Sequence, residues 1–177
     1  TVLVSVLVNW PLSFDGWNIK IVGSDFEKYA QQLNDLATEI DDYKSNLVTR
    51  FLLPELTDFD GWALFIDCDF VALEDVSNLF AQANDKYAVM CAQHDYTPKQ
   101  GIKMDGQQQT VYPRKNWSSM MLFNCGHPSN QKLTKELVND PDIDGKYLHR
   151  FSWLDDKEIG KISHEWNRLV GWYKERS

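Results

Sequence analysis

Residues 62–76 read WALFIDCDFVALEDV and set an apolar run directly against two aspartates, Asp67 and Asp69. The apolar run predicts a buried strand. Residues i and i+2 of a strand point to the same face, so the two carboxylates repel each other unless a cation lies between them or one is protonated. Oxygen ligands of this kind suit Mg²⁺ or Mn²⁺, which commonly bridges to phosphates. The same acids also have a plain structural interpretation, in which they cap the next helix or face solvent.

The rest of the chain alternates apolar runs with segments of helical spacing. Strands that are apolar on both faces and alternate with helices predict an α/β fold, in which a mostly parallel central sheet has helices on both faces. Ligands of such folds bind at the carboxyl ends of the strands, where Asp67 and Asp69 are expected. The expected strands are residues 1–10, 18–22, 62–66, 87–92 and 119–123. The expected helices are residues 24–40, 45–56, 76–83, 131–138 and 153–162.

Residues 93–115 are polar and interrupted by glycine and proline, which predicts a long loop. Loops of this length in compact domains are usually lids or binding loops. His94 comes directly after the expected strand 87–92, so it is the histidine most suited to be a pocket residue.

Composition sets the broad class of the protein. The 177 residues suffice for one domain with a core, and no repeat or linker divides them, so residues 1–177 are expected to form a single domain. A net charge of −8 without a basic stripe argues against nucleic acid as a main partner. Three cysteines without CxxC spacing favour a reducing, cytoplasmic setting. No apolar run reaches the ~18 residues of a membrane span, so no transmembrane segment is expected.

Two classes of metal-using enzyme carry a pair of aspartates at a strand end. In GT-A glycosyltransferases the pair holds a divalent metal on the diphosphate of a nucleotide sugar. In haloacid dehalogenase-like phosphatases the first aspartate attacks phosphorus and the second acts as acid and base. The phosphatase pattern is disfavoured by the long stretch before the motif and by Phe70 and Val71 in place of its usual Gly-Thr.

Five separated segments resemble a bacterial glycosyltransferase group related to glycosyltransferase family 8, over residues 45–173. They read VTRFLLPEL, GWALFIDCDFVALEDVSNLF, YAVMCAQHDYTPK, QTVYPRKNWSSMMLFNC and HEWNRLVG. The resemblance implies a Rossmann-like GT-A fold. It also implies an enzyme that transfers a hexose from a nucleotide diphosphate sugar to a glycan or other hydroxyl acceptor. Retention of configuration and a Mn²⁺ or Mg²⁺ cofactor follow from the same resemblance.

The resemblance also implies roles for particular residues. Asp67 and Asp69 would bind the metal, and Asp67 would also reach the donor ribose or sugar. Arg50 is placed near the donor, although a surface or core-edge arginine is the alternative. The predicted donor-binding residues that remain are Lys115, Asn116, Trp117, Ser118 and Ser119, with Arg114 as a neighbouring cation. Trp117 stacks on a sugar in this interpretation and packs in the core in the other.

The acceptor side and the chain ends complete the implied site. Asp155 and Asp156 would take the catalytic acidic role, unless they only favour the dipole at the start of a helix. No histidine of this chain matches the late metal-binding histidine of the family, and the family's first nucleotide-binding strand is not matched either. The resemblance therefore implies a fragment shortened at both ends, and a non-catalytic carbohydrate-binding or degenerate domain is a further alternative.

Overall fold

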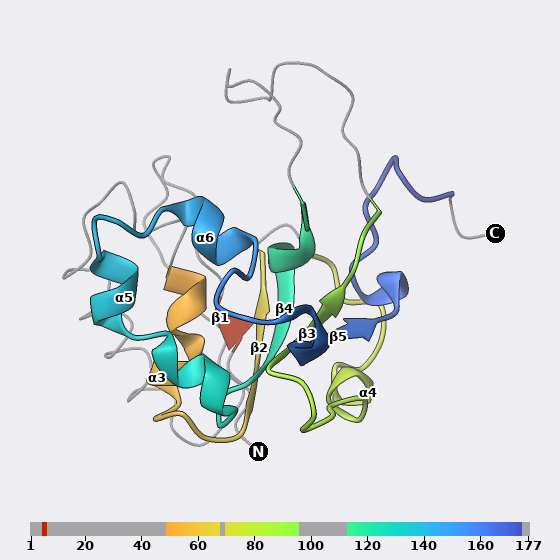
Figure 1. The fold of residues 1–177 in the computed structure, drawn as a ribbon. Coiled ribbons are helices and arrows are strands. Elements are labelled where there is room, and N and C mark those ends of the chain that lie inside the picture. The colour runs from red at the N-terminus through yellow and green to blue at the C-terminus, as the bar shows by residue number, and fades with distance from the viewer. Residues whose placement is uncertain (1–4, 7–48, 68–69, 96–112, 175–177) are drawn as a thin grey trace, which may run out of the picture.

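The computed structural model describes residues 5–6, 49–67, 70–95 and 113–174, and every structural statement below concerns these residues (Figure 1). The expected elements 18–22 and 24–40 lie outside them, as does most of the expected loop 93–115.

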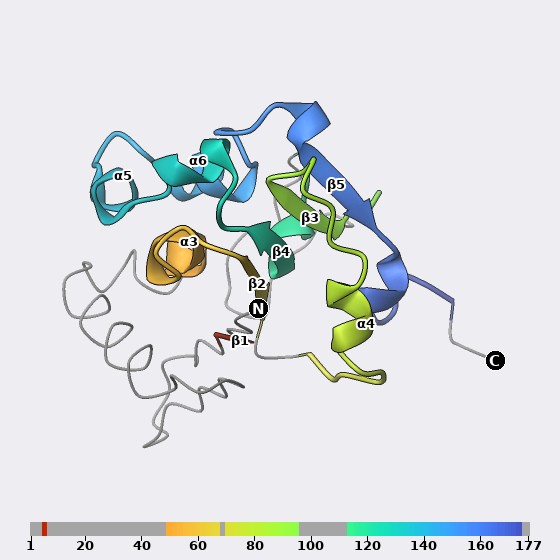
Figure 2. The same cartoon turned by 90° about the horizontal axis from the view of Figure 1, so that it is seen from below.

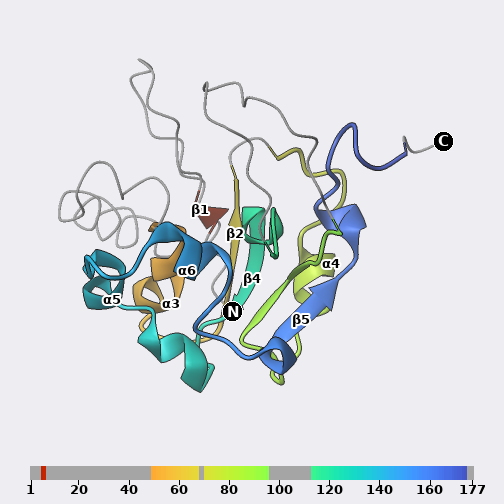
Figure 3. The same ribbon diagram turned by 45° about the horizontal axis from the view of Figure 1, so that its top comes forward.

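The described part of the chain forms an α/β structure around one five-stranded sheet. Its strands follow the order β1-β2-β4-β3-β5 across the sheet (Figure 3). The strands are β1 (Ser5–Val6), β2 (Trp62–Ile66), β3 (Val89–Ala92), β4 (Met120–Asn124) and β5 (Ile159–Ile162). The expected strands 62–66, 87–92 and 119–123 correspond to β2, β3 and β4, and β1 lies within the expected strand 1–10.

The sheet is mixed, so the prediction of a mostly parallel sheet is wrong. β1 pairs with β2 and β3 pairs with β5 in parallel, whereas the central β4 runs antiparallel to both β2 and β3. The register aligns Ile66 with Met120 and Trp62 with Asn124. A central strand that is buried on both faces is apolar in either direction, so its composition does not reveal its orientation.

Helices cover both faces of the sheet. Figure 2 shows α3, α5 and α6 on one side of the sheet and α4 on the other. The α-helices are α3 (Leu53–Leu56), α4 (Ser77–Phe80), α5 (Lys135–Asn139) and α6 (Gly145–His149). The 3-10 helices are η1 (Thr49–Leu52), η2 (Trp117–Ser119), η3 (Pro128–Lys132), η4 (Asp156–Glu158) and η5 (His164–Trp166). The prediction of helices on both faces is therefore confirmed, but the prediction of a helix over 153–162 is wrong because that segment ends in β5.

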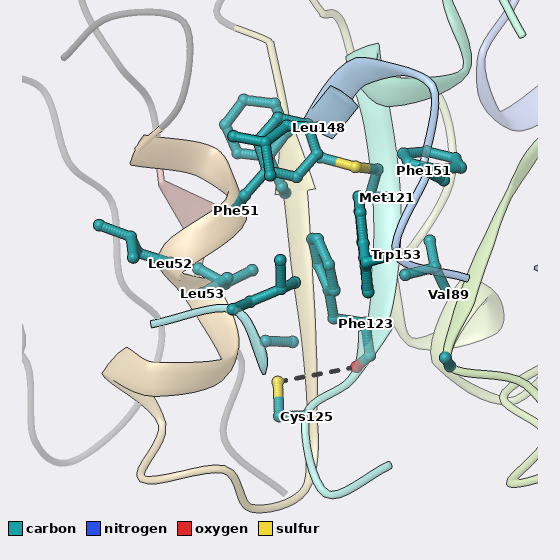
Figure 4. Packing of buried hydrophobic residues seen from close by; sticks show 14 of the residues in the cluster. Phe51, Leu52, Leu53, Val89, Met121, Phe123, Cys125, Leu148, Phe151 and Trp153 are labelled. Carbon is teal, nitrogen blue, oxygen red and sulfur yellow. Dashed lines mark hydrogen bonds between the residues drawn. The ribbon is translucent and has the colours of Figure 1, made fainter. Parts of the chain in front are cut away.

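The first core cluster lies between the sheet and the helices α3, α5 and α6. Phe65, Met121 and Phe123 enter it from β2 and β4, and each is at most 1% exposed. Figure 4 shows these strands facing Phe51 of η1 and Leu53, the first residue of α3. Since burying a large apolar side chain contributes roughly 1.5–3 kcal/mol, this cluster is the main source of stability in the described structure.

The second core cluster lies on the opposite face, beneath α4. Strand periodicity places Leu64 and Leu122 there, and Leu79 reaches it from α4. Trp166 from η5 packs against the same cluster and is only partly buried. The segment that follows β5 therefore contributes to the cover of this face.

Candidate functional site

Several polar side chains lie along one end of the sheet, next to the ends of its strands. β2, β3 and β5 run in the same direction and end at this edge, while the antiparallel β4 begins there. The residues next to these strand ends define what we call the polar edge: Asp67 after β2, His94 after β3, Ser118 and Ser119 before β4, and Asn167 after β5. Ligand sites of open α/β sheets lie at such edges.

Asp67 is held at the end of β2 by an arginine. Arg50 Nη1 lies 2.8 Å from Asp67 Oδ1, and the backbone N–H of Asp67 donates to the Ser119 carbonyl at 2.9 Å. The arginine side chain is 12% exposed and the aspartate side chain 33% exposed. The guanidinium also lies over the Phe65 ring, 4.5 Å from its centroid. Arg50 therefore forms a direct ion pair with Asp67, and its predicted place near the donor stays a prediction.

The two serines before β4 are tied to different partners. Ser118 Oγ lies 2.7 Å from His149 Nδ1, and the Ser118 carbonyl accepts from Arg50 Nη1 at 3.1 Å. Ser119 Oγ donates to the Asn116 carbonyl at 2.8 Å and accepts from Asn167 Nδ2 at 2.9 Å. Both predicted serines therefore lie at the polar edge. Each forms hydrogen bonds with residues that are distant in sequence.

His94 is the buried histidine of the polar edge. Its side chain is 5% exposed, and its Nδ1 lies 2.8 Å from the Tyr173 hydroxyl. Burial, together with a smaller contribution from the neighbouring His164, lowers the pKa of His94 from 6.5 to about 4, although the Asn167 side chain opposes the shift. His94 is therefore neutral at pH 7, and its ring accepts or donates hydrogen bonds without carrying charge.

The predicted residues 114–116 form a turn that leads into η2, and the Trp117 N–H donates to the Arg114 carbonyl at 3.2 Å. Lys115 is 7% exposed, so its ammonium is not a solvent-facing cation. Arg114 donates to the carbonyls of Arg150 and Phe151 and pairs with Asp156. Asn116 has a φ of 64°, in the left-handed region that disfavours most side chains.

Trp117 packs in the structure rather than facing outward. Its ring lies 6.5 Å from that of Phe151, centroid to centroid, and it packs against the first core cluster. Its indole N–H donates to the His94 carbonyl at 3.1 Å. The core alternative given for Trp117 matches this packing.

Asp155 and Asp156 precede β5 and therefore lie at its amino end, whereas Asp67 follows the carboxyl end of β2. The backbone N–H of Asp155 donates to Glu158 Oε2 at 2.8 Å, and Asp155 is the N-cap of η4. The Asp156 side chain is 92% exposed. These contacts match the helix-start alternative, and their predicted catalytic role stays a prediction.

The described residues contain no group of three or more His, Cys, Asp or Glu side chains placed to hold a metal ion. The described residues therefore give no support to the expectation of a metal-binding protein. Cys68 and Asp69 lie outside the described residues, so the pairing of Asp67 with Asp69 stays a prediction.

Three members of the polar network were not predicted: His149, Asn167 and Tyr173. Asn167 is 2% exposed although it is fully polar. The available signal was the segment HEWN, but its position depends on β5, which was expected to be a helix. Once β5 is paired with β3, the residues after it must reach the polar edge.

Comparison with known proteins overturns the bacterial glycosyltransferase interpretation. The chain is similar to Protein CDI of Arabidopsis thaliana, with 59% identity over 123 residues that make up 70% of this chain and 47% of that protein. The chain thus spans about half the length of this plant relative. A scan against models of known protein families finds no match, and neither does a search of solved structures.

The relative's name implies no enzymatic activity, and the similarity points to a plant protein rather than a bacterial one. The assignments to family 8 and to glycosyl transfer are therefore wrong, and the phosphatase alternative gains no support. In the part of the chain that the structure describes, no helix is long and apolar enough to cross a lipid bilayer.

Proposed function

We propose that the polar edge is a binding site for a nucleotide diphosphate sugar together with a divalent cation, Mn²⁺ or Mg²⁺. The observation that carries this proposal is Asp67, a partly exposed carboxylate held by Arg50 at the carboxyl end of β2. The proposal concerns binding and does not include glycosyl transfer.

The donor chemistry of the edge suits a cation that is shared with phosphate. Divalent cations such as Mg²⁺ are commonly bound by one or two carboxylates plus the phosphates of a ligand, not by a complete protein cage. Asp67 and Asp69 would supply the carboxylates, and the phosphates would complete the coordination.

Arg50 acts in this proposal by positioning Asp67. Its guanidinium makes three contacts at once, with the Asp67 carboxylate, the Ser118 carbonyl and the Phe65 ring. Because Arg presents its donors in a rigid fork, these contacts fix the orientation of the carboxylate before any ligand arrives. A lysine at this position would keep the charge and lose that geometry.

Four finer points stay predictions beside this proposal: the GT-A form of the α/β fold, the single domain over residues 1–177, enzymatic catalysis and a cytoplasmic location. Two buried free thiols, Cys91 and Cys125, agree with a reducing compartment.

Isothermal titration tests the proposal, with uridine and guanosine diphosphates as probes in Mn²⁺, in Mg²⁺ and in chelator. We expect binding that requires the metal and that weakens at least ~10-fold in Asp67→Asn and in Asp69→Asn. Asp142→Asn removes an exposed carboxylate on a distant loop and is the matched control. Arg50→Lys should weaken binding less than Asp67→Asn. Binding that is equally strong in chelator, or that is unchanged in both aspartate variants, contradicts the proposal.

A further inference from the structure

The residues that follow β5 lie at the polar edge. Residues 163–173, which we call the C-terminal strap, begin at the carboxyl end of β5 and include η5. Figure 1 shows this segment beside the carboxyl end of β3. The strap therefore lies at the edge where the ligand is proposed to bind.

A turn folds the end of the strap back onto its beginning. The N–H groups of Trp172 and Tyr173 both donate to the Leu169 carbonyl at 3.2 Å, and Gly171 has a φ of 79°. This left-handed conformation favours glycine, which lacks a Cβ. The Tyr173 ring then stacks on the His164 ring, with centroids 4.4 Å apart and planes at 16°.

Two polar contacts anchor the strap to the sheet. Tyr173 donates or accepts at His94 Nδ1 over 2.8 Å, and Asn167 Nδ2 donates to Ser119 Oγ at 2.9 Å. His94 Nε2 is buried and makes no hydrogen bond of normal geometry in the described structure. The anchor at His94 is thus a buried imidazole with one ring nitrogen bonded to the strap.

The groups around His94 determine how it responds to a proton. From the strap, the Tyr173 hydroxyl and the Asn167 side chain face its ring, and the His164 ring is near enough to repel its charged form. From η2, Trp117 contacts only the His94 carbonyl. Asp95, next in sequence, is exposed and raises the pKa of Tyr173, after burial as the main cause.

The outer side of the strap carries its own ion pairs. Glu165 Oε1 pairs with Arg168 Nη1 at 2.8 Å and lies 3.1 Å from His164 Nε2, a contact that is an ion pair only when His164 is protonated. These side chains are partly exposed, so their contribution is small and is weakened by salt. They stabilise the local fold of the strap and do not tie it to the sheet.

We propose that the C-terminal strap is a pH-sensitive latch over the polar edge, closed by the contact between Tyr173 and neutral His94 and opened by protonation of His94. A charged imidazole in this buried position faces no carboxylate among its contacts in the described residues. Release of the strap hydrates the ring, which favours the charged form.

The direction of the effect follows from the pKa of His94, which is about 4 in the closed state against an ordinary 6.5. Closure is fully favoured above about pH 6.5 and loses strength as the pH falls toward 4. For a released histidine of ordinary pKa, the closing equilibrium weakens roughly 4-fold at about pH 6 and roughly 30-fold at about pH 5.

Opening would free Ser119 Oγ from Asn167, and the Ser119 carbonyl accepts from the backbone N–H of Asp67. The latch therefore regulates the same edge as the proposed ligand site, and this consequence rests on the proposed function. The latch itself does not depend on any ligand.

Hydrogen–deuterium exchange of the wild-type protein at about pH 7.5 and about pH 5, corrected for intrinsic exchange rates, tests the latch. We expect the protection of residues 163–173 to fall roughly 30-fold, while β2 and β4 stay protected. His94→Gln should remove this pH dependence, and His127→Gln, the control at a histidine outside the strap, should retain it. Tyr173→Phe keeps the ring stack and loses the hydroxyl, so it should open more at about pH 7.5.

Unchanged strap protection at the two pH values overturns the latch, as does a pH dependence that persists in His94→Gln. Nuclear magnetic resonance titration of His94 in the wild-type protein covers the case in which that variant does not fold, and an ordinary pKa near 6.5 would also overturn the latch. Opening of the strap without nucleotide binding at either pH would leave the latch standing and contradict only the proposed function.

Discussion

The two faces of the sheet carry cores of different size. Among the described residues, nineteen buried side chains form the first core cluster and six form the second. The first is sealed by α3, α5 and α6, whereas the second is covered by the single short helix α4 and by partly buried residues such as Trp166 (Figure 2). Within the described residues, more apolar side chains are therefore buried on the first face than on the second.

This asymmetry has a functional side. The strap that packs Trp166 against the second cluster also reaches the polar edge through Asn167. Ligand-binding and moving elements are drawn from the less stable parts of a protein. The strap can therefore detach from the face of the second core cluster without exposing the first cluster.

Phe123→Ala should give the largest loss of stability because the side chain is fully buried in the first cluster. We expect a decrease in the free energy of unfolding of about 3–5 kcal/mol, from lost burial and from the cavity that remains. Urea denaturation measures it. Leu73→Ala, at a side chain that is 73% exposed, is the control and should stay within about 0.5 kcal/mol of wild type.

Leu79→Ala tests the second face. The side chain is 1% exposed, but α4 is only four residues long and follows an exposed stretch, so it can settle into the space left behind. We expect a loss of about 2–3 kcal/mol, in the lower part of the range for such changes. Asn78→Ala on the exposed side of α4 is the control. A loss equal to that of Phe123→Ala would show that the two faces are packed equally well.

Gly160→Ala probes the closest packing of the second face. A Cβ at this position would meet Tyr87 Cδ2 at 2.6 Å and Met90 Cγ at 2.7 Å. Overpacking of this kind typically costs about 1–3 kcal/mol, reduced here where the Met90 side chain can move. Gly126→Ala is the matched control because its Cβ would lie 3.5 Å from the nearest atom. Thermal melting of both variants should show a lower Tm for Gly160→Ala only.

The main strands could be predicted from the sequence because their apolar runs are short and unambiguous. β2 matches the expected strand 62–66 at both ends, and β4 is displaced by one residue. Strand direction could not be predicted, since β3 and β4 are buried on both faces whichever way they run. β5 was mistaken for a helix because the acids before it suit a helix start, whereas pairing with β3 determines its conformation.

Only those residues of the candidate site that flank the predicted strands could be predicted from the sequence. Asp67 and the two serines flank β2 and β4, so their meeting follows once these strands pair. The partners Asn167 and Tyr173 depend on the placement of β5, and no local pattern indicates that a tyrosine will bond to His94. The burial of Lys115 and the core packing of Trp117 are likewise outcomes of tertiary structure.

Chemical labelling of the buried thiols Cys91 and Cys125 can report when the core opens. Burial raises the pKa of Cys125 to about 11 and that of Cys91 well above its ordinary value. The reactive thiolate is therefore scarce at neutral pH, and neither sulfur is exposed. With Cys68 replaced, labelling of Cys91 or Cys125 would require this core to open. Labelling that is slower than reclosing would then measure the fraction of molecules that are open.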